Sequence, residues 1–137
     1  MTQARGSTVI SPVLIVPDGA AAAEWYKQVL EAKERWRVGS GHLVALDADG
    51  APLFVREETP PGRVSPASAG KINTVSIELF VDEPDRVVER ARLAGATATN
   101  MEDHQRSWGT HRQGGFTDPW GHSWLVGDKS PIAPWPQ

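Results

Sequence analysis

The residues of this chain that could bind a metal or transfer a proton are few and widely separated. Histidine occurs four times, at His42, His104, His111 and His122, and cysteine does not occur. The missing thiol excludes cysteine nucleophiles, disulfides and thiolate metal sites. No two histidines are two or four residues apart, the spacings that place two imidazoles on one face of a strand or a helix. We therefore expect no metal site, and we interpret His122, directly after a turn, as a structural residue with a local hydrogen bond.

Glu78 is the polar residue with the clearest chemical potential. It lies in the middle of the apolar stretch "NTVSIELFV" at 73–81, where a carboxylate is costly to desolvate unless it is paired or faces water. One interpretation is a salt bridge, to Arg56 or to a partner subunit. The other is a functional carboxylate, either a hydrogen-bond acceptor for a ligand amine or hydroxyl or a general base.

Composition narrows the class of protein further. The formal net charge is −3 with both signs mixed along the chain, which argues against a nucleic-acid partner. No stretch has the apolar length of a signal peptide or a membrane span, so we expect no membrane association and a cytoplasmic location. Thirteen glycines and eleven prolines favour a strand-rich or mixed fold. Six tryptophans suit an aromatic ligand site, although core packing is the simpler explanation for any one of them.

The elements that would position these residues occur in the same order twice. Hydrophobic periodicity predicts strand, helix, strand and hairpin in the first copy, at 8–16, 20–33, 34–39 and 42–58. It predicts the same elements in the second copy, at 73–81, 82–95, 96–101 and 107–127. The hairpins echo each other as "DADGAPLFV" and "DPWGHSWLV", and the first strands align as "SPVLIV" and "SIELFV". The repeated order of elements therefore indicates an internal duplication.

We predict a single α+β domain over 1–137, built from two tandem βαβββ modules. Module one spans 8–58 and module two spans 72–128, joined by a Pro- and Gly-rich linker at 59–71 and followed by a Pro-rich tail at 129–137. The modules would form a curved, partly open eight-stranded sheet with a central groove. A cleft at the junction of two modules is a favoured place for a small molecule.

Strand alternation assigns two faces to the first strand of each module. The faces expected to cover the helices carry Pro12, Leu14 and Val16 in module one, and Val75, Ile77, Leu79 and Val81 in module two. The opposite faces, expected to line the groove, carry Ser11, Val13 and Ile15 in module one, and Ser76, Glu78 and Phe80 in module two. We interpret 102–113, which contains His104 and His111, as a loop that is either solvated or folded over the groove.

The paired modules and the "WG…DPWGHSW" hairpin resemble the vicinal oxygen chelate superfamily, which includes glyoxalase I, bleomycin-resistance proteins and extradiol dioxygenases. The chain is most similar to the small PhnB-like bacterial members, through "EWYKQVLEAK", "ARLAGAT", "SWG" and "DPWGHSW". The resemblance covers residues 9–127. It implies a ligand site between the modules and a homodimer, in some members with modules exchanged between chains.

The resemblance also assigns four positions to the metal ligands of the related enzymes, and this chain has no suitable ligand there. The positions are Ser11 and Ser76 on the first strands and Phe54 and Leu125 on the last strands. Zinc, nickel, manganese and iron need imidazole or carboxylate ligands, which these side chains cannot supply. We therefore expect neither a metal nor another cofactor.

We hypothesise a metal-free small-molecule binding protein, with an antibiotic or a metabolite as the ligand, and lean against an enzyme. A planar or aromatic ligand would stack on Trp36, Phe54 and Trp108, while Glu78 and Arg56 orient its polar groups. The predicted groove residues are Ser11, Val13, Trp36, Phe54, Arg56, Ser76, Glu78, Phe80, Trp108 and Leu125. One alternative is a metal-dependent lyase or dioxygenase with a shell recruited from Glu78, His104 and His111. Another is metal-free acid–base catalysis by Glu78.

Overall fold

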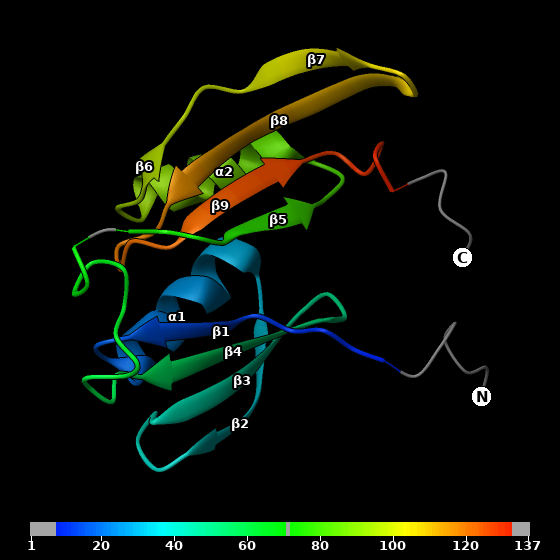
Figure 1. The fold of residues 1–137 in the computed structure, drawn as a ribbon. Coiled ribbons are helices and arrows are strands. Elements are labelled where there is room, and N and C mark those ends of the chain that lie inside the picture. The colour runs from blue at the N-terminus through cyan, green and yellow to red at the C-terminus, as the bar shows by residue number, and fades with distance from the viewer. Residues whose placement is uncertain (1–7, 71, 133–137) are drawn as a thin grey trace, which may run out of the picture.

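The structure, a computed structural model, describes residues 8–70 and 72–132, and these form two modules of helices and strands (Figure 1). Module one consists of β1 (Val13–Val16), α1 (Gly19–Leu30), β2 (Lys33–Val38), β3 (Leu43–Ala48) and β4 (Ala51–Glu57). Module two consists of β5 (Ser76–Phe80), α2 (Pro84–Leu93), β6 (Thr97–Ala98), β7 (Glu102–Arg106), β8 (Gly109–Thr117) and β9 (Ser123–Gly127).

Each module forms its own mixed sheet. The strand order is β1-β4-β3-β2 in module one and β5-β9-β8-β6 in module two, where β7 also pairs with β8. In both sheets the first strand runs parallel to the last strand of its module, and the other pairs are antiparallel. The predicted α+β fold of two modules is confirmed. The strands are nevertheless divided between two sheets rather than joined in one, because no strand of either module pairs with the other among the described residues.

The two helices begin and end at the residues that their local sequence favours. The Asp18 side chain accepts a hydrogen bond from the backbone N–H of Ala21 at 3.0 Å, which caps the start of α1. Pro84 occupies the first turn of α2, and Gly95 follows its end with a φ of 103° that disfavours other residues. No helix among the described residues is both long and apolar enough to cross a membrane.

The segment 102–113, interpreted from the sequence as a loop that runs into the hairpin predicted from residue 107, is instead β7 and the first part of β8. The strands pair antiparallel, with His104 directly opposite His111. The prediction was wrong because most of the segment "EDHQRSWGTHRQ" is polar, so it lacks the alternation of apolar residues that marks a half-buried strand. The tertiary pairing of β7 with β8 supplies the backbone hydrogen bonds without that pattern.

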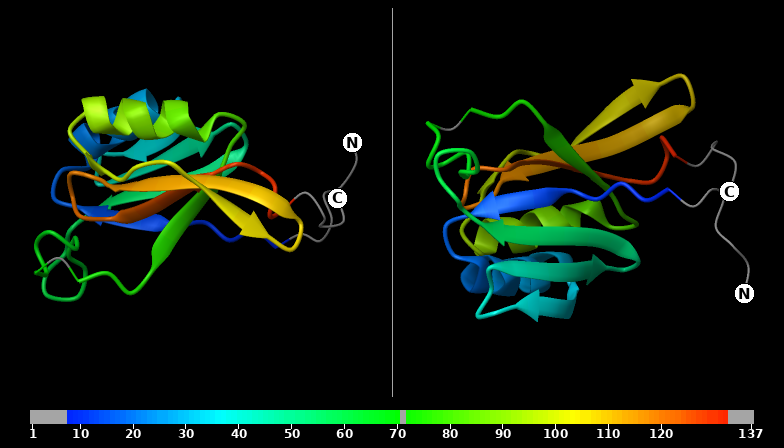
Figure 2. Two further views of the ribbon diagram at one scale, coloured as in Figure 1. Left: turned by 90° about the horizontal axis from the view of Figure 1, so that it is seen from above. Right: turned by 60° about the horizontal axis from the view of Figure 1, so that its bottom comes forward.

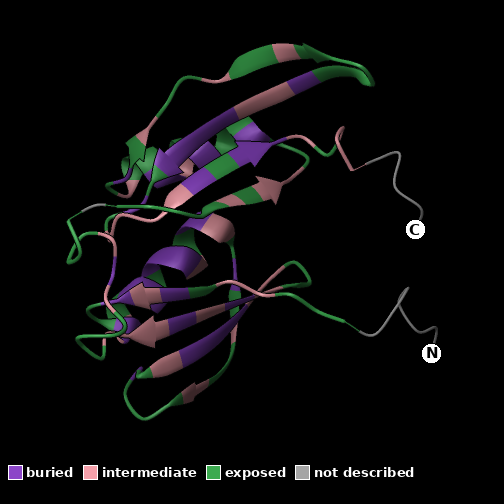
Figure 3. Cartoon of the chain, viewed as in Figure 1, coloured by how far each residue is buried: buried purple, intermediate pink, exposed green. Residues whose placement is uncertain are grey.

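The modules are joined mainly through their helices and a buried aromatic cluster. Buried residues occur along α1 and on β8 and β9 (Figure 3). Trp25 of α1 packs against Phe116 of β8 with ring centroids 5.9 Å apart, and its Nε1–H donates to the carbonyl of Ala94 at 2.8 Å. The Tyr26 hydroxyl and the Trp124 Nε1–H both donate to the buried carboxylate of Asp118. Because α1 and α2 lie together on one side of the molecule, the opposite faces of both sheets are left open (Figure 2).

This cluster also accounts for half of the tryptophans. Trp25 and Trp124 are buried in the core and Trp120 packs against it. Core packing therefore explains these three tryptophans. Trp36 and Trp108 remain 48% and 44% exposed. Trp135 lies outside the described residues.

Candidate functional site

The open face of module one, turned away from the helices, is mostly apolar. Strand register aligns its side chains in two rows across the sheet: Val13, Phe54, Ala45 and Trp36, then Ile15, Arg56, Leu43 and Val38. The rings of Trp36 and Phe54 lie with centroids 5.9 Å apart. About half of the Val13, Trp36 and Val38 surfaces remains exposed, at 49%, 48% and 50%. An aromatic pair and aliphatic neighbours therefore form an open surface on which a planar ring could stack.

Arg56 is the charged residue within these two rows. Its neighbours along the row are Ile15 and Leu43, and the side chain is partly buried among them. The described residues form no ion pair with its guanidinium. A half-buried cation between apolar neighbours is a favourable partner for an incoming anionic or hydrogen-bond-accepting group.

The open face of module two is more polar. Its rows across the sheet are Glu78, Leu125 and Gly115, then Phe80, Gly127, Gln113 and Glu102. Glu78 Oε2 accepts a hydrogen bond of 3.3 Å from the Gln113 side-chain amide. The suggested salt bridge between Glu78 and Arg56 is not formed, because the two residues lie on separate sheets.

The predicted groove residues thus fall into two groups, one on each sheet. Val13, Trp36, Phe54 and Arg56 lie together on module one, whereas Ser76, Glu78, Phe80 and Leu125 lie together on module two.

The other two predicted groove residues lie beside the sheet faces. Ser11 precedes β1, and its hydroxyl donates to the carbonyl of Pro52 at 3.0 Å. Trp108 occupies the turn between β7 and β8, where its Nε1–H donates to Ser130 Oγ at 3.0 Å.

A cleft of about 530 Å³ lies elsewhere, between the modules, and none of the predicted groove residues lines it. Its floor is formed by Leu30, Leu79, Val81 and Val87. Its walls carry charges of both signs, several of them already paired, as in the 2.5 Å contact of Arg35 with Asp47 and the 3.3 Å contact of Arg90 with Glu31. Most of the charged groups of this cleft are therefore already paired, although Lys33 and Asp49 form no ion pair among the described residues.

The four positions that the resemblance assigns to metal ligands do not carry suitable side chains. Phe54 and Leu125 have no donor atom, and the hydroxyl of Ser11 is bonded to the backbone. The recruited shell considered as an alternative does not assemble, since Glu78 bonds Gln113 and His111 bonds Asp128. Over residues 8–70 and 72–132 no three His, Asp or Glu side chains are grouped to hold an ion.

His122 is structural, but its hydrogen bond is not local as predicted. Its ring Nε2 lies 2.8 Å from the carbonyl oxygen of Ile15, on the outer edge of β1 in the other module. The local contact comes from its backbone N–H, which donates to Asp118 Oδ1 at 3.0 Å. The residue therefore helps to join the modules.

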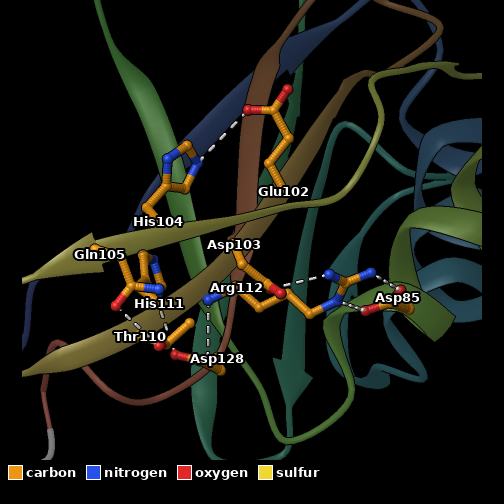
Figure 4. Close-up of polar contacts among 9 residues, drawn as sticks. All are labelled: Asp85, Glu102, Asp103, His104, Gln105, Thr110, His111, Arg112 and Asp128. Atoms are coloured by element: carbon orange, nitrogen blue, oxygen red, sulfur yellow. Dashed lines mark hydrogen bonds and ion pairs between the residues drawn. The ribbon is translucent and has the colours of Figure 1, made fainter.

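The β7–β8 hairpin holds the most tightly connected polar group near the open faces (Figure 4). His111 is buried, and its Nδ1 lies 2.8 Å from Asp128 Oδ1. Burial opposes ionisation of Asp128, but hydrogen bonds from Ser130, the Arg112 backbone and His111 prevail and hold the pKa of this carboxyl well below its ordinary value. At neutral pH the carboxylate is charged and accepts the proton carried by Nδ1.

Arg112 attaches the same hairpin to the start of α2. Its Nε and Nη2 donate to the two carboxylate oxygens of Asp85 at 2.7 and 2.8 Å, and its Nη1 donates to Asp103 at 3.0 Å (Figure 4). These hydrogen bonds raise the pKa of Arg112 above its ordinary value, and those to Asp85 lower the pKa of that carboxyl. The bidentate contact fixes the hairpin at the helix side, so that His111 and Gln113 face the opposite, open side.

Two of these polar contacts were missed from the sequence. Glu102 and His104 are two residues apart on β7, a spacing that the sequence displays, and their side chains approach to 3.9 Å. The pairing of His111 with Asp128 had no such signal, because it depends on the register between β8 and the end of β9.

Comparisons with known proteins agree with this architecture. Residues 9–126 match the glyoxalase-like domain family. An uncharacterised protein of Mycobacterium bovis is 36% identical over 127 residues, which cover 86% of this chain and 81% of that protein.

Two solved structures share the fold at lower identity. TioX from Micromonospora sp. ML1 superposes with a TM-score of 0.65 at 24% identity, covering 89% of this chain and 98% of that one. The fosfomycin resistance protein FosX from Mesorhizobium loti superposes with a TM-score of 0.60 at 16% identity, covering 92% and 93%. The duplicated modules, the match over nearly the whole chain and these superpositions lead to one conclusion: the chain belongs to the glyoxalase-like domain family, within the vicinal oxygen chelate superfamily.

Proposed function

We propose that this protein binds a small molecule without a metal, in an aromatic-lined groove built from the open sheet faces. The observation that carries the proposal is the open face of module one, where Trp36 and Phe54 lie in the row next to an Arg56 that has no ion pair among the described residues. Stacking a planar ring on such an aromatic pair removes apolar surface from water and contributes about 0.5–1.5 kcal/mol beyond that burial. The ligand would be an antibiotic or a metabolite with a planar ring and a polar substituent.

Arg56 and Glu78 would orient the polar groups of that ligand. The guanidinium suits an anionic or acceptor group. The Glu78 carboxylate suits an amine or hydroxyl, since within the described part of the chain its side-chain hydrogen bond is the long one from Gln113. The name of FosX refers to fosfomycin resistance, but its 16% identity supports the fold alone. The choice of ligand class therefore rests on the chemistry of these side chains. We place the chain nearest the PhnB-like and bleomycin-resistance members as part of the same proposal.

We also propose that the protein acts as a homodimer in which a second copy of the chain covers the open faces. Val13, Trp36 and Val38 on module one and Leu125 on module two are 36–50% exposed, and covering them is favourable. β5 keeps one edge without a strand partner among the described residues, whereas the corresponding edge of β1 is contacted by His122 of module two. Setting module one of one chain against module two of its partner would bring Arg56 and the partner's Glu78, of opposite charge, to one groove.

Binding of 1-naphthoate, a planar anion, tests the site. We expect it to quench tryptophan fluorescence, and we expect Trp36→Ala and Arg56→Met each to weaken binding about three- to tenfold. Arg63→Met is the matched control, since Arg63 lies in the linker, outside the strands of both sheets. Trp108→Ala should also weaken binding, and normal affinity in that variant would remove Trp108 from the site. Equal affinity in the wild type, Trp36→Ala and Arg56→Met would refute the proposed face.

Elemental analysis of the purified protein separates this proposal from the enzyme alternative. We expect no stoichiometric transition metal, because the four family positions offer no suitable ligand. Zinc, nickel, manganese or iron at one ion per chain would instead support a metal-dependent lyase or dioxygenase. Activity insensitive to chelators but lost in Glu78→Gln would support acid–base catalysis.

A further inference from the structure

His111 combines burial, a charged partner and an unpartnered ring nitrogen. The residue is 4% exposed. Its Nδ1 is bonded to Asp128, whereas its Nε2 is buried and has no hydrogen-bond partner among the described residues. A buried polar atom without a partner costs about 1–3 kcal/mol, so an arrangement that leaves one is unusual.

The surroundings of Asp128 fix which nitrogen carries the proton. Asp128 Oδ2 accepts the backbone N–H of Arg112, and Oδ1 accepts the backbone N–H of Ser130, both at 3.0 Å. A carboxylate held in this way is an acceptor towards His111, so Nδ1 must be the donor. In a neutral imidazole whose proton is on Nδ1, Nε2 is a bare lone pair, which can only accept a hydrogen bond.

The imidazole lies on the open face of module two. Gly127 occupies the same row as Phe80 and Gln113, so a side chain at that position would point to the open face. A Cβ built there would lie 2.6 Å from His111 Cε1 and 2.9 Å from Nε2. The ring thus occupies the space above Gly127, in the row adjacent to Glu78 and Leu125.

We propose that His111 Nε2 accepts a hydrogen bond from an O–H or N–H group of the bound ligand, with Asp128 as the positioning residue that keeps the lone pair free. The inference rests on the proposed ligand site and adds the class of ligand: a planar molecule with a hydroxyl or N–H donor. The donor supplies the partner that Nε2 lacks, and Asp128 strengthens the acceptor by holding the proton of the ring on the opposite nitrogen.

Because Nε2 is buried, a ligand can reach it only if neighbouring groups move. Trp108 is one such neighbour: its indole centroid lies 6.4 Å from that of His111, and the side chain is 44% exposed. In this proposal the indole leaves Ser130 Oγ and stacks on the ring of the ligand, which retains aromatic contact. Trp108 would then stack on the planar ligand, the role that the sequence predicts for it.

The test uses two probes of the same ring, 1-naphthol and 1-methoxynaphthalene, of which only naphthol has a donor. Long-range ¹H–¹⁵N spectra of the wild-type protein should show His111 protonated on Nδ1, and naphthol alone should shift the Nε2 resonance. Quenching of tryptophan fluorescence should give about three- to tenfold tighter binding of naphthol than of methoxynaphthalene. His111→Phe should lose this preference, whereas His104→Phe, on the opposite strand, should keep it.

The nitrogen spectra keep the proposal falsifiable if His111→Phe does not fold. A proton found on Nε2, or an Nε2 resonance unmoved while naphthol quenches fluorescence, overturns the role of His111. Equal binding of both probes, weakened by Trp36→Ala, overturns that role and leaves the proposed groove intact. Binding of neither probe counts against the groove and the inference together.

Discussion

At the scale of single residues, Asp118 is the carboxylate on which the junction of the modules depends. Its side chain accepts from the Tyr26 hydroxyl, from the indole of Trp124 and from the backbone N–H groups of Trp120 and His122. These donors come from α1, from the turn between β8 and β9, and from β9 itself. Because each would be left buried without a partner, the carboxylate stabilises the contact between the two modules.

Tyr26, the only tyrosine in the chain, should make stability fall at alkaline pH. Burial, the charge of Asp118 and the hydrogen bond to it raise the pKa of Tyr26 well above its ordinary value. Above pH of about 10 the unfolded chain loses the phenol proton while the folded chain retains it. Ionisation therefore stabilises the unfolded state relative to the folded state. The free energy of unfolding should fall by up to about 1.4 kcal/mol per pH unit there, measured by urea denaturation.

Tyr26→Phe is the control for this prediction. It should cost about 1 kcal/mol at pH 7 through loss of the hydrogen bond, and should remove the alkaline dependence due to this group. Tyrosinate absorbance that develops near pH 10 in the still-folded wild type would contradict the prediction.

At the scale of elements, the β7–β8 hairpin decides where the polar groups of module two lie. Arg112 anchors its helix side to Asp85, and the alternation of β8 then turns His111 and Gln113 to the open face. The absence of a side chain at Gly127 on β9 leaves room for the imidazole. The hairpin therefore positions a hydrogen-bond acceptor on a sheet that otherwise presents Glu78, Phe80 and Leu125.

Gly127→Ala tests this placement. The added methyl would lie within 3.0 Å of the His111 ring and of the Arg112 carbonyl, so the imidazole must shift. We expect a loss of about 1–3 kcal/mol in the free energy of unfolding and displaced His111 resonances in nitrogen spectra.

Gly62→Ala serves as the matched control, because a Cβ there meets nothing within 4 Å. It should leave stability unchanged or raise it by about 0.4–1 kcal/mol. A Gly127→Ala protein with native stability and native His111 resonances would place the ring elsewhere.

At the scale of the whole molecule, the open sheet faces are the part that a second copy would complete. The helices bury one face of each sheet, while Val13, Trp36 and Val38 remain about half exposed on the other face of module one. Apolar surface in this arrangement favours association. The proposed homodimer accounts for these exposed rows.

Sedimentation or light scattering should give a mass of twice 14.9 kDa for the wild type. The double variant Val13→Glu/Val38→Glu should shift the protein to monomer, because two carboxylates would have to be buried in the interface. Leu93→Glu is the control, since Leu93 is 72% exposed on α2, away from the open faces. A wild-type monomer, or a double variant that stays dimeric, would count against this interface.

The sequence by itself determined the two modules and the two helices. Asp18, Pro84 and Gly95 mark helix ends through contacts within a few residues, and the alternation of Leu14 and Val16 identifies a buried strand face. Such features depend on neighbours close along the chain, so they can be recognised in the sequence.

Only the tertiary structure decided the division into two sheets, the β7–β8 hairpin and the partners of the buried polar groups. The contact of His111 with Asp128 depends on strand register, and that of His122 with Ile15 joins residues 107 apart. The polar strand β7 has no apolar alternation and exists because β8 pairs with it. Contacts of this kind depend on how distant segments pack, and local propensity and periodicity do not encode that packing.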